Sequence, residues 1–273
     1  MATRALQFTS QPAQPPEYSS LRRWGLFDGM IFGPVQSRRF GRSLGINTLP
    51  SDRKICSFDC IYCELGRTTM AMPEMVRASF PEPNALITEL NSVLDDLADQ
   101  TPDTLTLTGN GEPTMHPSFE EIAAAVLDVR AKRIPDATVA VLTNGTYIDK
   151  PAIARALDAV DVVMLKLDAG TPESMDRIDV PLVSWNPDRV VRASKKLRRV
   201  VIQALFLEGA VKNTDDAEVE RWIALLREIK PESVVIYTLD RVPPEPGLRP
   251  APRSTLDSIG RRTESAGFPC DVL

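Results

Sequence analysis

Three cysteines within eight residues are the part of this 273-residue sequence best suited to chemistry. Cys56, Cys60 and Cys63 are separated by three and then two residues, and the chain has one further cysteine, Cys270. Thiolates bind iron-sulfur clusters, normally four at a time, so a set of three leaves one iron open to another ligand. A closed zinc site would need a fourth ligand, for which His116 and Cys270 are the candidates. The spacing favours an open iron-sulfur cluster, with zinc as the alternative, and in a reducing compartment it argues against disulfides.

A glycine-rich turn is the second feature of this kind. Gly109, Asn110, Gly111 and Glu112 follow the strand-like run at 104–108. Glycine lets the backbone approach a ligand closely, and a carboxylate comes directly after it. The alternative is an ordinary loop between a strand and a helix.

Together the two features resemble the radical S-adenosylmethionine (SAM) superfamily, with Tyr62 as the aromatic residue before the third cysteine. The resemblance implies a 4Fe-4S cluster on the three cysteines, whose fourth iron holds SAM. It also implies reductive cleavage of SAM to a 5'-deoxyadenosyl radical, which abstracts hydrogen from a substrate. Residues 110–112 resemble the superfamily's Gly-Gly-Glu motif, with Asn110 in place of the first glycine. We therefore expect Tyr62 and residues 109–112 to bind SAM, with Glu112 and its turn receiving the amino group.

Polar side chains near the ends of later strands are further candidates. Asn144 and Gln203 resemble superfamily positions that touch the methionine or ribose part of SAM, whereas no glycine-containing adenine motif is recognisable at 202–207. Lys166 and Asp168 share one face of an otherwise apolar strand, because side chains alternate along a strand. We expect them to be catalytic, since polar residues at the carboxyl ends of barrel strands mark active sites. The alternative is a buried internal ion pair.

The segment before the cysteines carries Arg38, Arg39 and Arg42. Together with Arg53 and Lys54 they form a local basic patch suited to phosphate or carboxylate, or else a solvated charge run. With the cysteine loop it resembles the branch of the superfamily similar to wyosine-tRNA synthases. Cys270 alone cannot hold the second cluster that wyosine synthases generally carry, so we do not assign that activity. The basic segment leaves a small-molecule, nucleotide or RNA substrate open, although the net charge of -5 gives no overall field to hold nucleic acid.

Two other functions remain as alternatives. One is an activase that makes a glycyl radical on a partner protein. The other is a non-catalytic iron-sulfur or zinc module. For the enzyme we expect a reductant protein of the flavodoxin or ferredoxin type as partner.

Alternating strand and helix patterns predict the architecture. Strands are expected at 43–47, 104–108, 138–143, 161–167, 200–207 and 233–239, and helices at about 86–97, 118–127, 150–158, 186–198, 215–229 and 252–266. This alternation fits either an open doubly wound sheet or a partial barrel. The superfamily resemblance implies an α/β fold with a partial (β/α)6 barrel of parallel strands and outer helices.

The domain boundary is predicted from composition. Residues 1–28 resemble a flexible extension, and 29–273 are expected to form one domain. No apolar run is long enough to span a membrane and no secretory signal is recognisable, so we expect a cytoplasmic protein.

Overall fold

The computed structural model describes residues 25–71, 80–97 and 100–273. Six parallel strands form the centre of an eight-stranded sheet, and their order in space follows their order in the chain. They are β2 (Gly41–Asn47), β3 (Thr104–Thr108), β4 (Thr138–Thr143), β5 (Val162–Lys166), β6 (Val200–Leu205) and β8 (Ser233–Tyr237). Each overlaps a predicted strand. A doubly wound sheet reverses its strand order at a switch point, and this sheet does not. The predicted α/β class, a mostly parallel sheet with outer helices, is confirmed.

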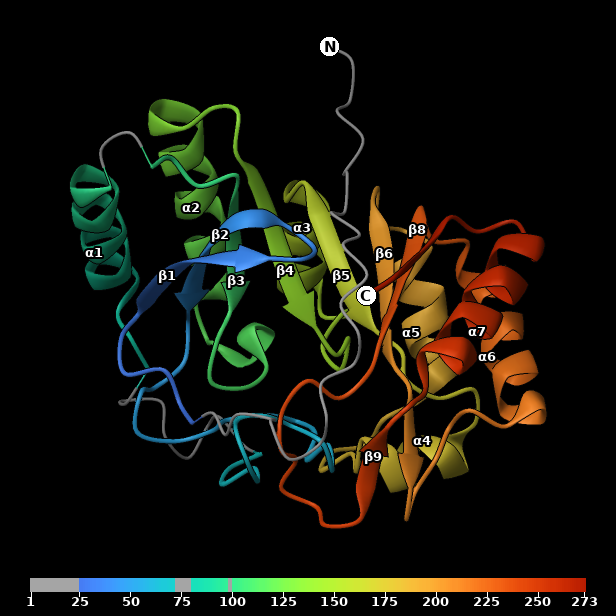
Figure 1. The fold of residues 1–273 in the computed structure, drawn as a ribbon. Helices are drawn as coiled ribbons and strands as arrows, with labels where there is room; N and C mark the ends of the chain where they lie inside the picture. The colour runs from blue at the N-terminus through green and yellow to red at the C-terminus, as the bar shows by residue number, and fades with distance from the viewer. Residues whose placement is uncertain (1–24, 72–79, 98–99) are drawn as a thin grey trace.

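Helices connect the parallel strands and cover one side of the sheet (Figure 1). The six predicted helices are α1 (Pro83–Asp96), α2 (Phe119–Arg133), α3 (Pro151–Ala159), α5 (Pro187–Ser194), α6 (Asp216–Ile229) and α7 (Arg253–Ser265). In α1 the leucines at positions 86, 90 and 94 are buried, as three-and-four spacing requires. Proline opens α1, α3 and α5, where its missing N–H costs no helical hydrogen bond.

Several shorter elements were not predicted. β1 (Ile31–Ser37) pairs antiparallel with β2, and β10 (Cys270–Val272) pairs parallel with β8, so these two strands form the outer edges of the sheet. α4 (Pro172–Ile178) follows β5, and β7 (Leu207–Gly209) pairs with β9 (Leu248–Pro250) in a separate two-stranded ribbon. A short 3-10 turn, Pro113–Met115, follows the glycine turn.

The two faces of the sheet carry different side chains. The face toward the helices contributes residues such as Leu105, Val139 and Leu165 to the main core. The inner face has its own apolar layer, made by Ala140, Val162, Met164, Val201 and Val235. Phe40, from the turn between β1 and β2, packs into that layer, so the β1–β2 hairpin lies against the inner face (Figure 1). The turn of the hairpin thus packs on the inner apolar layer, whereas the polar residue Lys166 ends β5 at the carboxyl edge of the sheet.

The described residues contain no helix that is both long enough and apolar enough to cross a bilayer. Of the predicted extension, residues 1–24 lie outside the described part of the chain. Phe27 is described, and it is hydrogen-bonded to the folded domain through Asn110.

Candidate active site

The cysteine loop follows the carboxyl end of β2 and is joined to the glycine turn through one residue, Ile55. The Ile55 N–H donates to the carbonyl of Asn110 at 3.0 Å, and the Ile55 carbonyl accepts from the N–H of Glu112 at 3.0 Å. On the other side, the N–H of Cys56 donates to the carbonyl of Met70 at 3.1 Å. These backbone bonds fix the first cysteine beside the turn that the sequence singled out.

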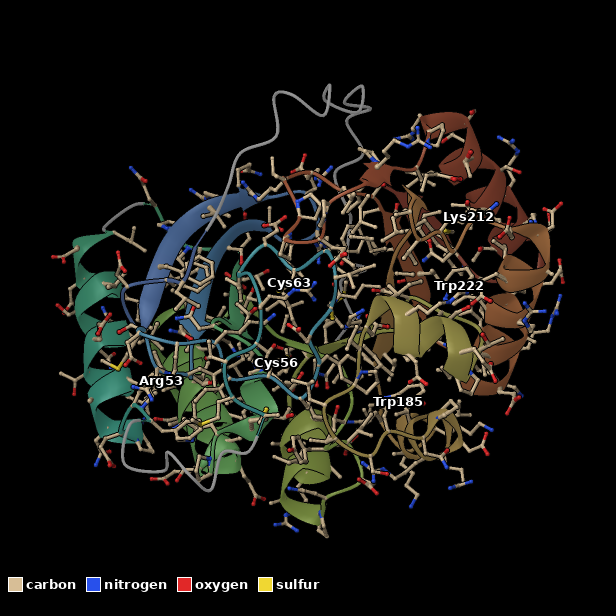
Figure 2. All side chains as sticks on the ribbon, turned by 90° about the horizontal axis from the view of Figure 1, so that it is seen from below. Arg53, Cys56, Cys63, Trp185, Lys212 and Trp222 are labelled. Carbon is tan, nitrogen blue, oxygen red and sulfur yellow. The ribbon has the colours of Figure 1, made fainter. Side chains whose placement is uncertain are left out.

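The three thiols lie around a buried ammonium. Cys56 and Cys60 are buried and Cys63 is half-buried, and Figure 2 shows Cys56 and Cys63 on the loop near the centre of the molecule. Burial raises the pKa of Cys56 to about 12 and raises that of Cys60 as well. Burial alone would lower the pKa of Lys54, but the charges of the three cysteines together raise it. Lys54 as a residue is 3% exposed, and its Nζ also donates to the carbonyl of Gly66 at 2.7 Å. Lys54 is therefore near enough to feel the charges of all three thiols, whereas the cation that opposes the pKa shift of Cys60 is Lys166.

The three cysteines are free thiols, and none of them forms a disulfide within the described residues. No three His, Cys, Asp or Glu side chains among residues 25–71, 80–97 and 100–273 already converge as metal ligands. The donor set nevertheless fits an iron-sulfur cluster, because it consists of soft sulfur ligands facing a buried positive charge.

Neither candidate for a fourth ligand lies ready to close a zinc site. Cys270 stands in β10 beside Val234, near the amino end of β8, whereas the cysteine loop leaves the carboxyl end of β2. The ring of His116 is engaged on both sides: Nδ1 accepts from the N–H of Ser118, and Nε2 lies 2.9 Å from the carbonyl of Pro81. The predicted cluster on Cys56, Cys60 and Cys63 stays a prediction, and neither candidate for a fourth ligand contributes to it in this structure.

The glycines of the turn are required because other parts of the protein approach them closely, and the predicted approach of a ligand stays a prediction. Gly109 has φ +125° and Gly111 has φ +139°. A Cβ on Gly109 would stand 2.1 Å from Oδ1 of Asn47, and a Cβ on Gly111 would stand 1.8 Å from the carbonyl oxygen of Ile55. Any side chain at Gly111 would therefore separate the turn from the cysteine loop.

Asn110 uses its side chain to hold the chain before β1. Its Oδ1 accepts from the N–H of Phe27 at 2.8 Å, and its Nδ2 donates to the carbonyls of Phe27 and Pro50 at 2.9 and 3.0 Å. The residue is fully buried. These contacts account for asparagine in place of the motif's first glycine. Cofactor contact by Asn110 stays a prediction; its backbone also has partners, since the N–H donates to Oδ1 of Asn47 and the carbonyl accepts from Ile55.

Glu112 joins the ends of β3 and β4. Its carboxylate accepts hydrogen bonds from the N–H and hydroxyl of Thr114, from the hydroxyl of Thr143 at 2.7 Å and from the N–H of Asn144 at 2.7 Å. It is 2% exposed, and burial raises its pKa in spite of these donors. The predicted carboxylate contact with the SAM amino group stays a prediction. In this structure the acid holds two loops together.

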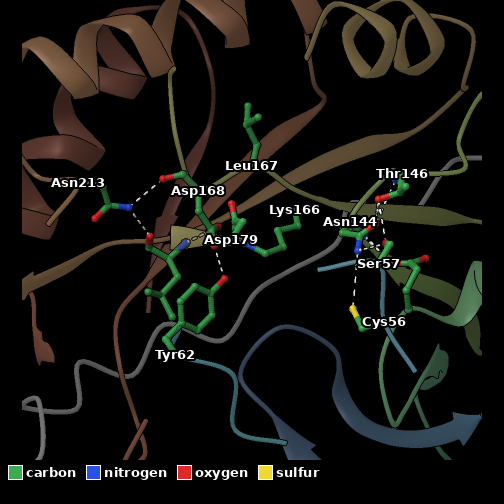
Figure 3. Close-up of polar contacts among 12 residues, drawn as sticks. Cys56, Ser57, Tyr62, Asn144, Thr146, Lys166, Leu167, Asp168, Asp179 and Asn213 are labelled. Carbon is green, nitrogen blue, oxygen red and sulfur yellow. Dashed lines mark hydrogen bonds and ion pairs between the residues drawn. The ribbon is translucent and has the colours of Figure 1, made fainter. Parts of the chain in front are cut away.

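Asn144 reaches from the end of β4 to the cysteine loop (Figure 3). Its Nδ2 donates to Oγ of Ser57 at 2.8 Å and points toward Sγ of Cys56 at 3.8 Å. Its Oδ1 accepts from the N–H and the hydroxyl of Thr146. The predicted SAM-binding residue thus lies beside a candidate cluster ligand.

Lys166 and Asp168 share the inner face, as strand alternation predicts, and belong to a buried network. The Lys166 ammonium contacts Asp168 and Asp179, and Asp168 also accepts from the Tyr62 hydroxyl and from the N–H of Leu205 (Figure 3). Both carboxylates have no exposed surface. Burial alone would lower the pKa of Lys166, but the two aspartates raise it well above its usual range. Their catalytic role stays a prediction, and the arrangement is that of a buried ion network.

Asp179 was not singled out by sequence reasoning. It lies beyond α4, one residue after the helix ends, and no motif marks it. Burial raises the pKa of Asp179 to about 7, with Lys166 opposing the shift. Its backbone carbonyl also accepts from the N–H of Asp59, so it holds the cysteine loop from the side opposite Ile55.

The three arginines do not form one patch. Arg42 pairs with Asp103 and Arg38 with Asp240. Arg39 alone turns inward, and its Nη1 donates to Oε1 of Gln203 at 2.6 Å. Gln203 was expected to touch SAM. That contact stays a prediction, and here its oxygen is occupied by Arg39.

The sequence of this chain is similar to those of known proteins. A model of the Radical SAM superfamily matches residues 53–226. A UPF0026 protein of Helicobacter pylori is 31% identical over 84% of this chain and 71% of its own length. A protein named GTPase Obg, from Brachyspira hyodysenteriae, is 32% identical over 77% of this chain, which spans 30% of that protein's length.

Solved structures share the fold at low identity. A radical SAM methyltransferase from Sphaerobacter thermophilus superimposes with a TM-score of 0.65, 15% identity, and coverage of 85% of this chain and 65% of that one. TYW1, a wyosine synthase, with a lysine-pyruvate adduct bound superimposes with a TM-score of 0.55 and 15% identity, covering 82% and 73%. The superfamily expected from the motifs is confirmed, and the likeness to TYW1 shows a shared fold.

Proposed function

Because this chain belongs to the Radical SAM superfamily, we propose that it is an enzyme that binds a 4Fe-4S cluster on Cys56, Cys60 and Cys63 and cleaves SAM reductively. The superfamily uses this cluster and SAM. When bound, the cluster supplies one electron that splits SAM into methionine and a 5'-deoxyadenosyl radical, which takes hydrogen from a substrate. The observation that carries the proposal is the Ile55 junction, which joins the three-cysteine loop and the glycine turn through paired backbone hydrogen bonds.

The residues around the thiols are suited to a cluster. The buried Lys54 ammonium offsets the negative charge that three thiolates bring, and the Asn144 amide points a donor at Cys56. Such donors and charges around a metal centre hold its ligands in place and tune it.

The residues at the carboxyl edge position the loops that SAM would contact. Glu112 ties the turn after β3 to Thr143 and Asn144 at the end of β4. Because the Glu112 carboxylate already accepts four hydrogen bonds, we infer that Glu112 acts by setting the distance between these two loops. We infer that the backbone of the turn meets the amino group of SAM.

The ion network acts on the opposite side of the loop. Asp168 fixes the Tyr62 hydroxyl, and Lys166 lies over the Tyr62 ring at 5.1 Å from its centroid. Because both oxygens of Asp168 are occupied, we infer that Lys166 and Asp168 position Tyr62 beside Cys63 and exclude water, without themselves touching substrate.

The electron has to come from outside the chain. Superfamily members generally need a reductant, and we propose a flavodoxin or ferredoxin type of protein in that role. Chemical reduction replaces it in the test below.

The experiment measures 5'-deoxyadenosine formed from SAM by anaerobically reconstituted, dithionite-reduced protein. The wild type and Cys270→Ala are expected to form the product and to keep the visible absorption of the cluster. Cys63→Ala is expected to lose both. If the wild type forms no product and holds one zinc per chain, the enzyme proposal is wrong and a metal-binding module takes its place.

A further inference from the structure

The β1–β2 hairpin carries a cation into the inside of the curved sheet. Phe40 anchors the turn in the inner apolar layer, which includes Val162, Val201 and Val235. Arg39, the residue before it, reaches Gln203, which pairs across the sheet with Lys166. The guanidinium therefore lies on the same face as the ion network, and the carboxylate of Glu64, the residue after Cys63, is near enough to feel its charge.

The guanidinium of Arg39 is held in a fixed orientation. Its Nη1 donates to Gln203, and its Cζ stands 4.8 Å from the centroid of the Tyr237 ring, the geometry of a cation–π contact. Tyr237 ends β8, so the ring forms a wall at the carboxyl edge. A neutral amide and an aromatic ring orient a guanidinium without neutralising its charge.

The neighbouring cations are all paired with carboxylates. Lys166 has Asp168 and Asp179, Arg241 has Glu64 at 2.6 Å, and Arg38 has Asp240 at 3.6 Å. Arg39 has no carboxylate within 4.0 Å in the part of the chain that the structure describes. A guanidinium carries five N–H donors, and one hydrogen bond to Gln203 leaves most of them for another acceptor.

We propose that Arg39 binds an anionic group of the substrate, a carboxylate or a phosphate, with Gln203 and Tyr237 orienting its guanidinium. This rests on the proposed function, since it gives the hydrogen-donating substrate its point of attachment inside the sheet. Arginine suits this task because its planar fork meets both oxygens of such a group at once. If Arg39 had only a structural role, packing of its long side chain on Tyr237 would be sufficient, and a charged group would not be needed.

The test uses reconstituted protein and two probes, inorganic phosphate and succinate, each compared with sodium chloride at equal ionic strength. A ligand that binds only the folded state raises the melting temperature in a saturable way, which yields its dissociation constant. The variants are Arg39→Gln and Arg39→Lys. Arg42→Gln is the matched control, because Arg42 lies in the same hairpin but pairs with Asp103 at the surface.

The wild type and Arg42→Gln are expected to show a saturable response to at least one probe beyond that to chloride. Arg39→Gln is expected to lose that response. Arg39→Lys keeps a positive charge and serves as the second variant if Arg39→Gln does not fold. We expect it to bind the probe about tenfold more weakly than the wild type does. A response to phosphate alone indicates a phosphate-bearing substrate, and a response to succinate alone indicates a carboxylate.

Three outcomes overturn the inference: no response to either probe in the wild type, an unchanged dissociation constant in both Arg39 variants, or an equal loss in Arg42→Gln. Anion binding is measured without SAM. Failure to form 5'-deoxyadenosine therefore refutes the proposed function separately from this inference.

Discussion

Glu112 offers the sharpest test of how the site is built. Its carboxylate accepts four hydrogen bonds that link the glycine turn to the end of β4. Replacing it with alanine removes the acceptor and leaves the donors behind. The N–H groups of Thr114 and Asn144 belong to fixed backbone and cannot turn elsewhere, whereas the two threonine hydroxyls can rotate.

The expected loss follows from those donors. A buried donor left without its partner costs about 1–3 kcal/mol, and more when the lost acceptor is charged. Two fixed N–H groups, with a smaller contribution from the hydroxyls, give a loss of about 3–5 kcal/mol in the free energy of unfolding for Glu112→Ala. That is a large part of the roughly 5–15 kcal/mol that stabilises a typical native protein. Glu112→Gln keeps the shape of the side chain and one acceptor oxygen, but its amide NH2 faces a donor. We therefore expect the free energy of unfolding to fall by about half as much as in Glu112→Ala.

Urea unfolding of the metal-free proteins measures these differences. Glu120→Ala is the matched control, because Glu120 pairs with Arg155 at the surface, where an ion pair contributes little. We expect Glu120→Ala to have the same urea midpoint as the wild type. The midpoints of the two Glu112 variants should be lower, and that of Glu112→Ala the lowest. If Glu112→Ala unfolds at the same midpoint as Glu120→Ala, the carboxylate does not hold the loops and the reasoning fails.

Three further outcomes are expected. Asn110→Gly should speed amide hydrogen exchange at residues 25–30, because the three side-chain hydrogen bonds to Phe27 and Pro50 are lost, and unchanged exchange there would contradict the anchoring role. Lys166→Met should lower the free energy of unfolding at pH 7 by about 3–5 kcal/mol, since it leaves two buried carboxylates without their cation, and an unchanged urea midpoint would refute this. Burial raises the pKa of Asp271 above 3.8, so the wild type should lose stability as pH rises from 3.8 toward the folded value. Asp271→Asn should therefore be more stable than the wild type at pH 7 and equal to it at pH 3, and a pH-independent difference would count against the shift.

The regular part of the fold was predictable because each strand and helix carries its own pattern. Strands such as Val162–Lys166 are nearly continuous β-branched or apolar runs, and a helix such as α1 shows its buried stripe directly. β1 was missed because Gly33 and Pro34 interrupt it, and its pairing comes from the neighbouring strand. The predicted helix at 186–198 ends at residue 194, where the run of basic residues begins.

The site was predictable only as far as its residues are local in sequence. The cysteine spacing and the glycine turn are recognisable as local motifs. The placement of Lys166, which ends β5, and of Asp168, two residues later, on one face follows from alternation. The residues that contact these side chains, and so determine their charge and orientation, lie far away in the sequence. Asp179 reaches Lys166 from the end of a seven-residue helix, and Arg39 reaches Gln203 across 164 positions. No pattern in the sequence specifies that one arginine of three turns inward.

Ile55 has a consequence for the order in which the site is assembled. Its N–H and carbonyl bind the residues on either side of Gly111, so the cysteine loop and the glycine turn cannot tighten or loosen separately. For the proposed site, in which the loop holds the cluster and the turn meets SAM, we expect binding at one to strengthen binding at the other. By thermodynamic reciprocity the cluster and SAM then raise each other's affinity by the same factor, so that loading either half of the site prepares the other.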